Sequence, residues 1–142
     1  MTWFYYSLAA AMFWGVSYTL SEKILRKVDV STYLAYSYLF EFLIIFLFGC
    51  KTGKLKLDLQ TIESSTWALM TLIAILQLCG NYCISTSIQG KNASLASIIE
   101  ISYPFFTIAS TYLLFKENQV TFGSIVGSAF VFIGVAIILK GC

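Results

Sequence analysis

The sequence contains no histidine and has only 11% charged residues, and each shortage excludes a class of function. Without an imidazole, the chain cannot build a histidine-ligated zinc site or a Ser-His or Cys-His nucleophile pair. Soluble domains carry about 25% charged residues, so this chain, with 58% hydrophobic residues, is not an ordinary soluble enzyme. The net charge of +2, without a basic run, also excludes a nucleic-acid-binding surface.

Motifs for redox, metal or nucleotide chemistry are missing as well. Cys79 and Cys83 lie four residues apart, and Cys50 and Cys142 stand alone, so the four cysteines form no Cys-x-x-Cys framework. No glycine-rich stretch is followed by Lys-Ser or Lys-Thr, the pattern that cradles nucleotide phosphates. We therefore expect no enzyme, no ATP-driven motor, no cofactor and no bound metal.

Long apolar runs are what the chain does contain. Five segments approach the roughly 20 residues that a helix needs to cross a bilayer, and they are continuous rather than alternating, which favours helices over barrel strands. They run from Phe4 to Leu20, Thr32 to Gly49, Trp67 to Thr86, Leu95 to Phe115, and Phe122 to Leu139. The sequence predicts an all-α integral membrane protein of the cell membrane, with five transmembrane helices in a single domain over residues 1–142.

The orientation of such a chain follows from its basic residues, because Lys and Arg near span ends favour the cytoplasmic side. Five spans put the two termini on opposite sides. One side then holds Lys51, Lys54, Lys56 and Lys116, and the other holds Lys23, Arg26, Lys27, Lys91 and Lys140. This even distribution leaves two interpretations open. Either the orientation is fixed, or the chain inserts both ways and forms an antiparallel pair, the arrangement of inverted repeats in transporters.

Two carboxylates lie within the predicted spans. Glu41 is near the centre of the second segment, where a charged side chain costs about 2.5–3.5 kcal/mol. It is either a substrate-cation or proton site, or a protonated residue hydrogen-bonded across helices. Glu100 lies nearer the start of the fourth segment, on a polar stripe with Pro104, which removes a backbone donor and predicts a helix break. The stripe suits either a translocation path or interhelical packing.

Other polar and aromatic side chains are candidates for the same site. Gln77 and Asn81 lie four residues apart on one face of the third segment, where their amides bond either a substrate or a neighbouring helix. Aromatic rings attract cations, but they also serve in packing and in interfacial belts. The aromatic candidates for the cavity are Trp14, Tyr18, Tyr36, Tyr38 and Tyr103.

Small residues mark the last segment. Gly123 and Gly127 form a small-xxx-small pattern, and Gly134 follows one heptad later. This face predicts close helix packing, either within the chain or against a second protomer.

Several of these features together resemble an EamA-type repeat of the drug/metabolite transporter superfamily. The residues that carry the resemblance are Ala10-Ala11-Met12-Phe13-Trp14-Gly15 in the first span, Ala93-Ser94-Leu95-Ala96-Ser97, Pro104, Glu117, Gly127 and Gly134. The chain departs from the pattern where Lys116-Glu117 replaces the usual Gly-Glu. An arginine often found early in the second span is also absent, with Ser37 near that place and Glu41 one turn later.

The resemblance implies a partner, because larger members look like two such repeats fused with inverted topology around a central cavity. We therefore expect a secondary transporter of small molecules or metabolites that works by alternating access as a dimer, with protons as one candidate coupling ion. The dimer is either a homodimer, parallel or antiparallel, or a heterodimer with a paralogue. The missing arginine favours a cationic or zwitterionic substrate. The alternative is a non-transporting membrane subunit or scaffold that assembles with a paralogous partner.

Overall fold

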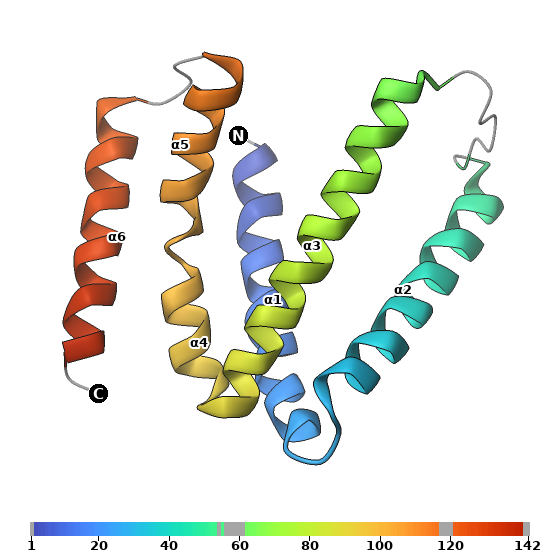
Figure 1. The fold of residues 1–142 in the computed structure, drawn as a ribbon, viewed down its shortest axis with the longest axis horizontal. Coiled ribbons are helices and arrows are strands. Elements are labelled where there is room, and N and C mark those ends of the chain that lie inside the picture. The colour runs from blue at the N-terminus through green and yellow to red at the C-terminus, as the bar shows by residue number, and fades with distance from the viewer. Residues whose placement is uncertain (1, 54, 56–61, 117–120, 141–142) are drawn as a thin grey trace.

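Apart from short connections, the chain is helical. The computed structural model describes residues 2–53, 55, 62–116 and 121–140, and in that part it contains helices and no strand. Glu117 lies outside the described residues. The helices are α1 (Thr2–Leu25), α2 (Val30–Thr52), α3 (Ser64–Gly90), α4 (Ala93–Glu100), α5 (Tyr103–Phe115) and α6 (Phe122–Lys140) (Figure 1).

These helices correspond to the five predicted spans, with α4 and α5 together forming the fourth. By length and hydropathy, α2, α3 and the combined stretch Ala93–Phe115 are clear membrane spans, and the apolar part of α6 is slightly shorter. Helix α1 is 24 residues long and has a lower hydropathy than these spans, because it contains two Trp, three Tyr and several Ser and Thr residues. The helices extend a few residues beyond the predicted segments. Helix α3, for example, runs to Gly90 rather than Thr86.

Helices α1, α2, α3 and α4 meet at one end of the molecule, which we call the closed end. The buried apolar residues gather there: Leu25, Val30, Leu34, Ile88, Ala93 and Ala96. From this end α2 and α3 diverge, so that they are well separated where α2 finishes and α3 begins (Figure 1). The first turn of α1 and the last turn of α6 lie at opposite ends of the molecule, as an odd number of spans requires (Figure 1).

Hydrogen bonds join and cap the helices at the closed end. The carboxylate of Glu22, past the apolar stretch of α1, accepts a 2.8 Å hydrogen bond from the N–H of Ala93 at the start of α4. Asn92 is the N-cap of α4, and its side chain accepts from the N–H of Leu95 at 2.8 Å. Gln89 of α3 donates to the carbonyl of Leu25 at 2.8 Å. These bonds satisfy helix-terminal groups that would otherwise lack partners.

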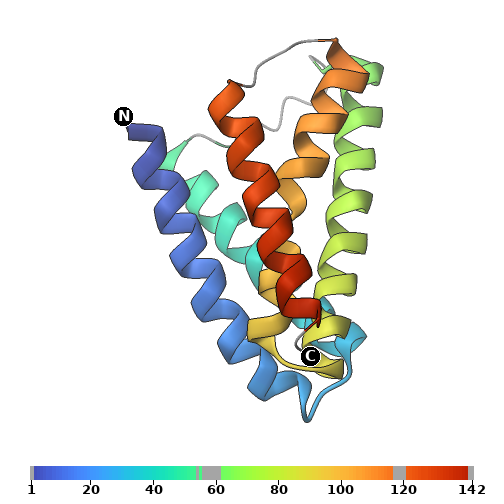
Figure 2. The same cartoon turned by 90° about the vertical axis from the view of Figure 1, so that its left-hand side faces the viewer.

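The fourth span is broken in its middle. Helix α4 ends at Glu100, residues 101–102 form a turn, and α5 begins at Tyr103 with Pro104 in its first turn. Proline has no N–H to donate to the carbonyl four residues earlier, so it starts a helix more readily than it continues one. Helix α6 packs beside α5, on the outside of the helices that meet at the closed end (Figure 2).

Candidate functional site

A cavity of about 460 Å³ lies between α1, α2, α3 and α4, directly above the closed end. It is lined by Trp14, Ser17, Tyr18, Ser21, Tyr33, Leu34, Ser37, Tyr38, Glu41, Gln77, Gly80, Asn81, Ile84, Ser85, Ile88 and Glu100. Seven of the eight residues predicted for substrate binding or proton coupling are in this set. Four separate helices contribute them.

Helical periodicity explains why so many residues of each helix reach the cavity. Helix α1 contributes positions 14, 17, 18 and 21, and α2 contributes 34, 37, 38 and 41. Both sets follow the spacing i, i+3, i+4, i+7, which places side chains on one face of an α-helix. The set from helix α3 is about one turn longer and runs from Gln77 to Ile88. Three helices therefore turn their polar stripes toward the same space.

The hydroxyl of Tyr18 donates a 2.9 Å hydrogen bond to Oε1 of Glu100, across the cavity from α1 to α4. Each of the two residues lies seven positions from the closed-end terminus of its helix, about 10 Å along the axis. Nearer to the closed end, the hydroxyl oxygens of Ser21 and Tyr33 are 2.7 Å apart and share a hydrogen bond. The part of the cavity nearest the closed end is thus held by hydroxyl bonds between helices.

Asn81 and Tyr38 connect the other two walls. The side-chain amide of Asn81 on α3 donates to the hydroxyl of Tyr38 on α2 at 2.8 Å. This is the interhelical role weighed for Asn81 from the sequence, and it occurs on the cavity wall. The bond fixes the spacing of α2 and α3 just before they diverge.

Glu41 and Trp14 lie farther from the closed end, each about 16 Å along its helix axis. That depth is close to the middle of a hydrocarbon layer roughly 30 Å thick. The side chain of Trp14 is 57% exposed, and Glu41 is exposed as well. Within the described residues, no hydrogen bond or ion pair reaches the Glu41 carboxylate. Among the residues that the structure describes, no lysine or arginine lines the cavity.

Two predicted aromatic residues lie outside this cavity. Tyr36 is on the exposed side of α2, one residue away from the stripe that Leu34, Ser37 and Tyr38 form. Tyr103 is the first residue of α5 and is 54% exposed. The polar stripe predicted along the fourth span is divided between two spaces, because Glu100 lines this cavity whereas Pro104, after the turn, lines a separate groove.

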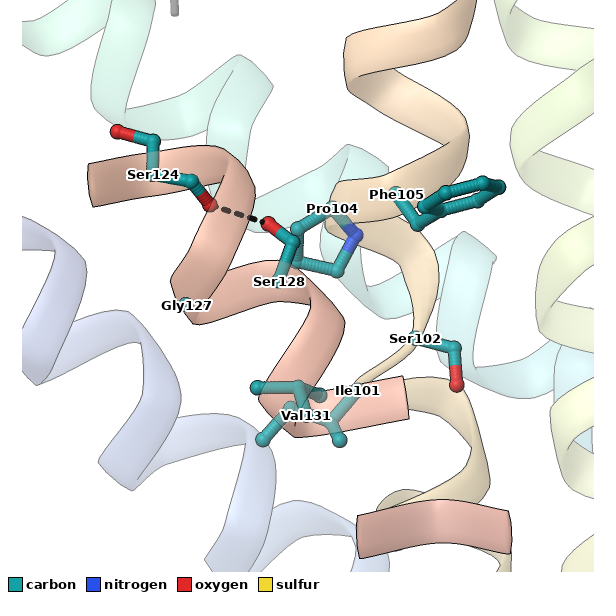
Figure 3. Close-up of a pocket in the computed structure, with 8 residues that line it drawn as sticks. All are labelled: Ile101, Ser102, Pro104, Phe105, Ser124, Gly127, Ser128 and Val131. Carbon is teal, nitrogen blue, oxygen red and sulfur yellow. Dashed lines mark hydrogen bonds between the residues drawn. The ribbon is translucent and has the colours of Figure 1, made fainter. Parts of the chain in front are cut away.

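A second, smaller groove of about 200 Å³ lies between the helix break and α6 (Figure 3). Pro104 and Phe105 line it from α5, and Gly127 and Ser128 line it from α6. A Cβ atom added at Gly127 or Gly134 would meet no atom within 4 Å, and one at Gly123 would approach only the hydroxyl of Thr121, at 3.8 Å. The small residues of α6 are therefore not required by contacts within the described chain.

Sequence reasoning missed several cavity residues. They are Ser17, Ser21, Tyr33, Ser37 and Gly80. Helical spacing could have identified two of them, because Ser17 and Ser21 lie on the same face of the helix as Trp14 and Tyr18. No group of three or more Cys, Asp or Glu residues that could hold a metal occurs in the part of the chain that the structure describes.

Comparison with known proteins identifies the family. Neither the curated proteins nor the solved structures give a match. The model of the EamA-like transporter family, in contrast, matches residues 1–140, which is almost the whole chain. With its apolar spanning helices, the chain is a multi-pass integral membrane protein of the drug/metabolite transporter type. It belongs to the EamA-like transporter family.

Proposed function

We propose that the chain is a secondary transporter of small molecules that works by alternating access as a dimer of single repeats. The observation that carries the proposal is the polar cavity between α1 and α4, which contains two carboxylates within a membrane-spanning region. Polar and ionisable side chains at this depth are costly, and they are retained in membrane proteins where they mark a pathway. A cavity of 460 Å³ is within the usual size of small-molecule sites.

The shape of the helix arrangement supports alternating access. Packed apolar residues and the bonds of Glu22, Gln89 and Asn92 close one end of the cavity. At the far end α2 and α3 diverge (Figure 1). Transport then requires the closed end to open and the far end to close. The turn between α4 and α5 is the hinge in this proposal, because Pro104 has no N–H to donate to the carbonyl of Glu100, four residues earlier.

Incomplete burial supports a dimer. At most 6% of the residues in the three clear spans are buried within the chain, and Glu41 is exposed near mid-membrane. A carboxylate at that depth avoids lipid, so a second subunit is the natural cover for the cavity's open side. An antiparallel second copy would place a closed end on each side of the membrane, as inverted repeats do.

Flux through the purified protein tests the proposal. The protein is reconstituted in liposomes, and uptake of a broad panel of labelled metabolites is measured with and without a proton gradient. We expect saturable flux of at least one compound, lost on Glu100→Gln and stimulated by the gradient. Absence of flux for every compound would overturn the transporter proposal. Flux insensitive to the gradient would overturn proton coupling alone.

Labelling of Cys50 tests the antiparallel arrangement. With the other three cysteines changed to serine, Cys50 at the end of α2 is the sole thiol, and it is exposed. A membrane-impermeant maleimide applied to intact cells should label about half of the chains if they insert both ways. A matched variant places the only cysteine at Lys23, on the opposite side, and should also be half labelled. Complete labelling of one variant and none of the other would show a single orientation.

A further inference from the structure

We infer that the cavity binds an organic cation with one positive charge, and that Glu41 is the residue that pairs with this charge. The inference rests on the proposed transport function and assigns its substrate class. It follows from three features of the cavity wall: its charges, the different bonding of the two carboxylates, and its aromatic rings.

The charges on the wall have one sign. Two carboxylates, Glu41 and Glu100, line the cavity, and no basic side chain of the described residues does. Lys23 lies in the last turn of α1 and Arg26 directly after it, and Arg26 is paired with Glu22. An anion entering this space would meet like charge without a partner, whereas a cation would meet one or two opposite charges. Such charge differences matter more within a membrane protein than in bulk water, because the effective dielectric constant is lower.

The two carboxylates are not equivalent. Glu100 accepts a hydrogen bond from Tyr18 at 2.9 Å, so part of its charge is already stabilised by the protein. The carboxylate of Glu41 has no such partner in the described part of the chain and lies close to mid-membrane. Its charge therefore needs a partner that is not permanently present. A substrate cation supplies that partner when bound.

Aromatic rings line the same space. Trp14, Tyr18, Tyr33 and Tyr38 all reach the cavity, and the faces of such rings attract cations, most strongly when the cation is poorly hydrated. A quaternary ammonium or phosphonium ion has this property. A zwitterion is a poorer fit, because its carboxylate would meet the like charges of Glu41 and Glu100 and no basic side chain among the described lining residues.

Ligand pairs of matched shape test the substrate class. Choline, glycine betaine and 3,3-dimethylbutanol share a branched head but are a cation, a zwitterion and a neutral molecule. Tetraphenylphosphonium and tetraphenylborate share a shape but carry opposite charges. Binding is measured by calorimetry on the purified full-length protein in detergent. A variant with Trp3→Phe and Trp67→Phe leaves Trp14 as the only indole, so its fluorescence reports whether the ligand enters the cavity.

We expect at least one cation to bind more tightly than its neutral, zwitterionic or anionic counterpart and to change the fluorescence of Trp14. Glu41→Gln should weaken that binding at least about tenfold. Glu63→Gln is the matched control, since Glu63 lies outside the cavity at the start of α3, and it should leave binding unchanged. If the cations bind no better than their counterparts, or Glu41→Gln has no effect, the inference is wrong.

This result is separate from the test of transport. If the protein carries a neutral or anionic metabolite in liposomes but does not bind cations preferentially, the transport proposal holds and the inferred substrate class is wrong. If the protein binds cations through Glu41 but carries no compound across the membrane, the cation site is confirmed and the transport proposal is wrong.

Discussion

The hydroxyl of Tyr18 donates a hydrogen bond to the carboxylate of Glu100 at 2.9 Å, and this bond joins α1 to α4 on the cavity wall. It connects the first helix of the chain to the half-helix that ends at the break. Any movement of α4 against α1 must therefore stretch or release it. The pair is thus both a structural link between helices and a part of the proposed transport site.

Tyr18→Phe should destabilise the protein and slow transport. A hydrogen bond to a charged group contributes about 1.5–3 kcal/mol, and the variant removes it without changing the ring. We expect a lower melting temperature in detergent and a reduced rate of uptake in liposomes. Tyr36→Phe is the matched control, because Tyr36 lies outside the cavity. Equal melting temperatures for the two variants would contradict the prediction.

Asn92→Ala should also lower stability, by about 1 kcal/mol. The side chain of Asn92 accepts from the N–H of Leu95 and so caps α4, a helix only eight residues long. Asn92→Asp retains an acceptor at the same place and should keep most of the stability. Thermal unfolding of the three proteins in one detergent measures the difference. An aspartate variant as unstable as the alanine variant would show that the cap is not the cause.

The helices and much of the site could be predicted from the sequence, because both depend on local pattern. Apolar runs predicted the five spans, and spacing of three or four residues placed Gln77 and Asn81 on one face, which lines the cavity. Glu41 was identified from the cost of a carboxylate in mid-span, which is a property of a single residue and its depth.

What the sequence could not supply is the pairing of helices. The bonds from Tyr18 to Glu100 and from Tyr38 to Asn81 join residues 82 and 43 positions apart, and periodicity carries no information about such contacts. Tyr103 was predicted as one of the aromatic residues that could line the cavity. In the structure it is the first residue of α5, after the turn at residues 101–102, and it lies outside the cavity.

Stability should fall in acid through Glu22. The N–H of Ala93 and then the guanidinium of Arg26 hold the pKa of this carboxyl below its ordinary value of 4.5. A group whose pKa is lower in the folded state stabilises the fold above its unfolded pKa, and the benefit is lost as the pH falls through the folded pKa. We expect the melting temperature to fall between about pH 5 and about pH 3.

Glu22→Gln should flatten this dependence, because the amide cannot be protonated in that range but still offers an oxygen to Ala93. Glu63→Gln is the control, since Glu63 accepts only a local bond from Ser65. Melting curves that change with pH in the same way for both variants would show that another group is responsible.

Two glycines should respond in opposite ways to alanine. At Gly49 an added Cβ would lie 2.9 Å from the Cβ of Leu55, an atom fixed to the backbone, so something must shift. Overpacking of this kind costs about 1–3 kcal/mol, and Gly49→Ala should lower the melting temperature. At Gly127 the added Cβ meets nothing within 4 Å, and alanine favours a helix over glycine by up to about 1 kcal/mol. Gly127→Ala should therefore leave the melting temperature unchanged or raise it. The dimer content of the same samples is also measured. If Gly127→Ala lowers both the melting temperature and the dimer content, the prediction is wrong, and the face of α6 that contains Gly127 lies at the interface between subunits.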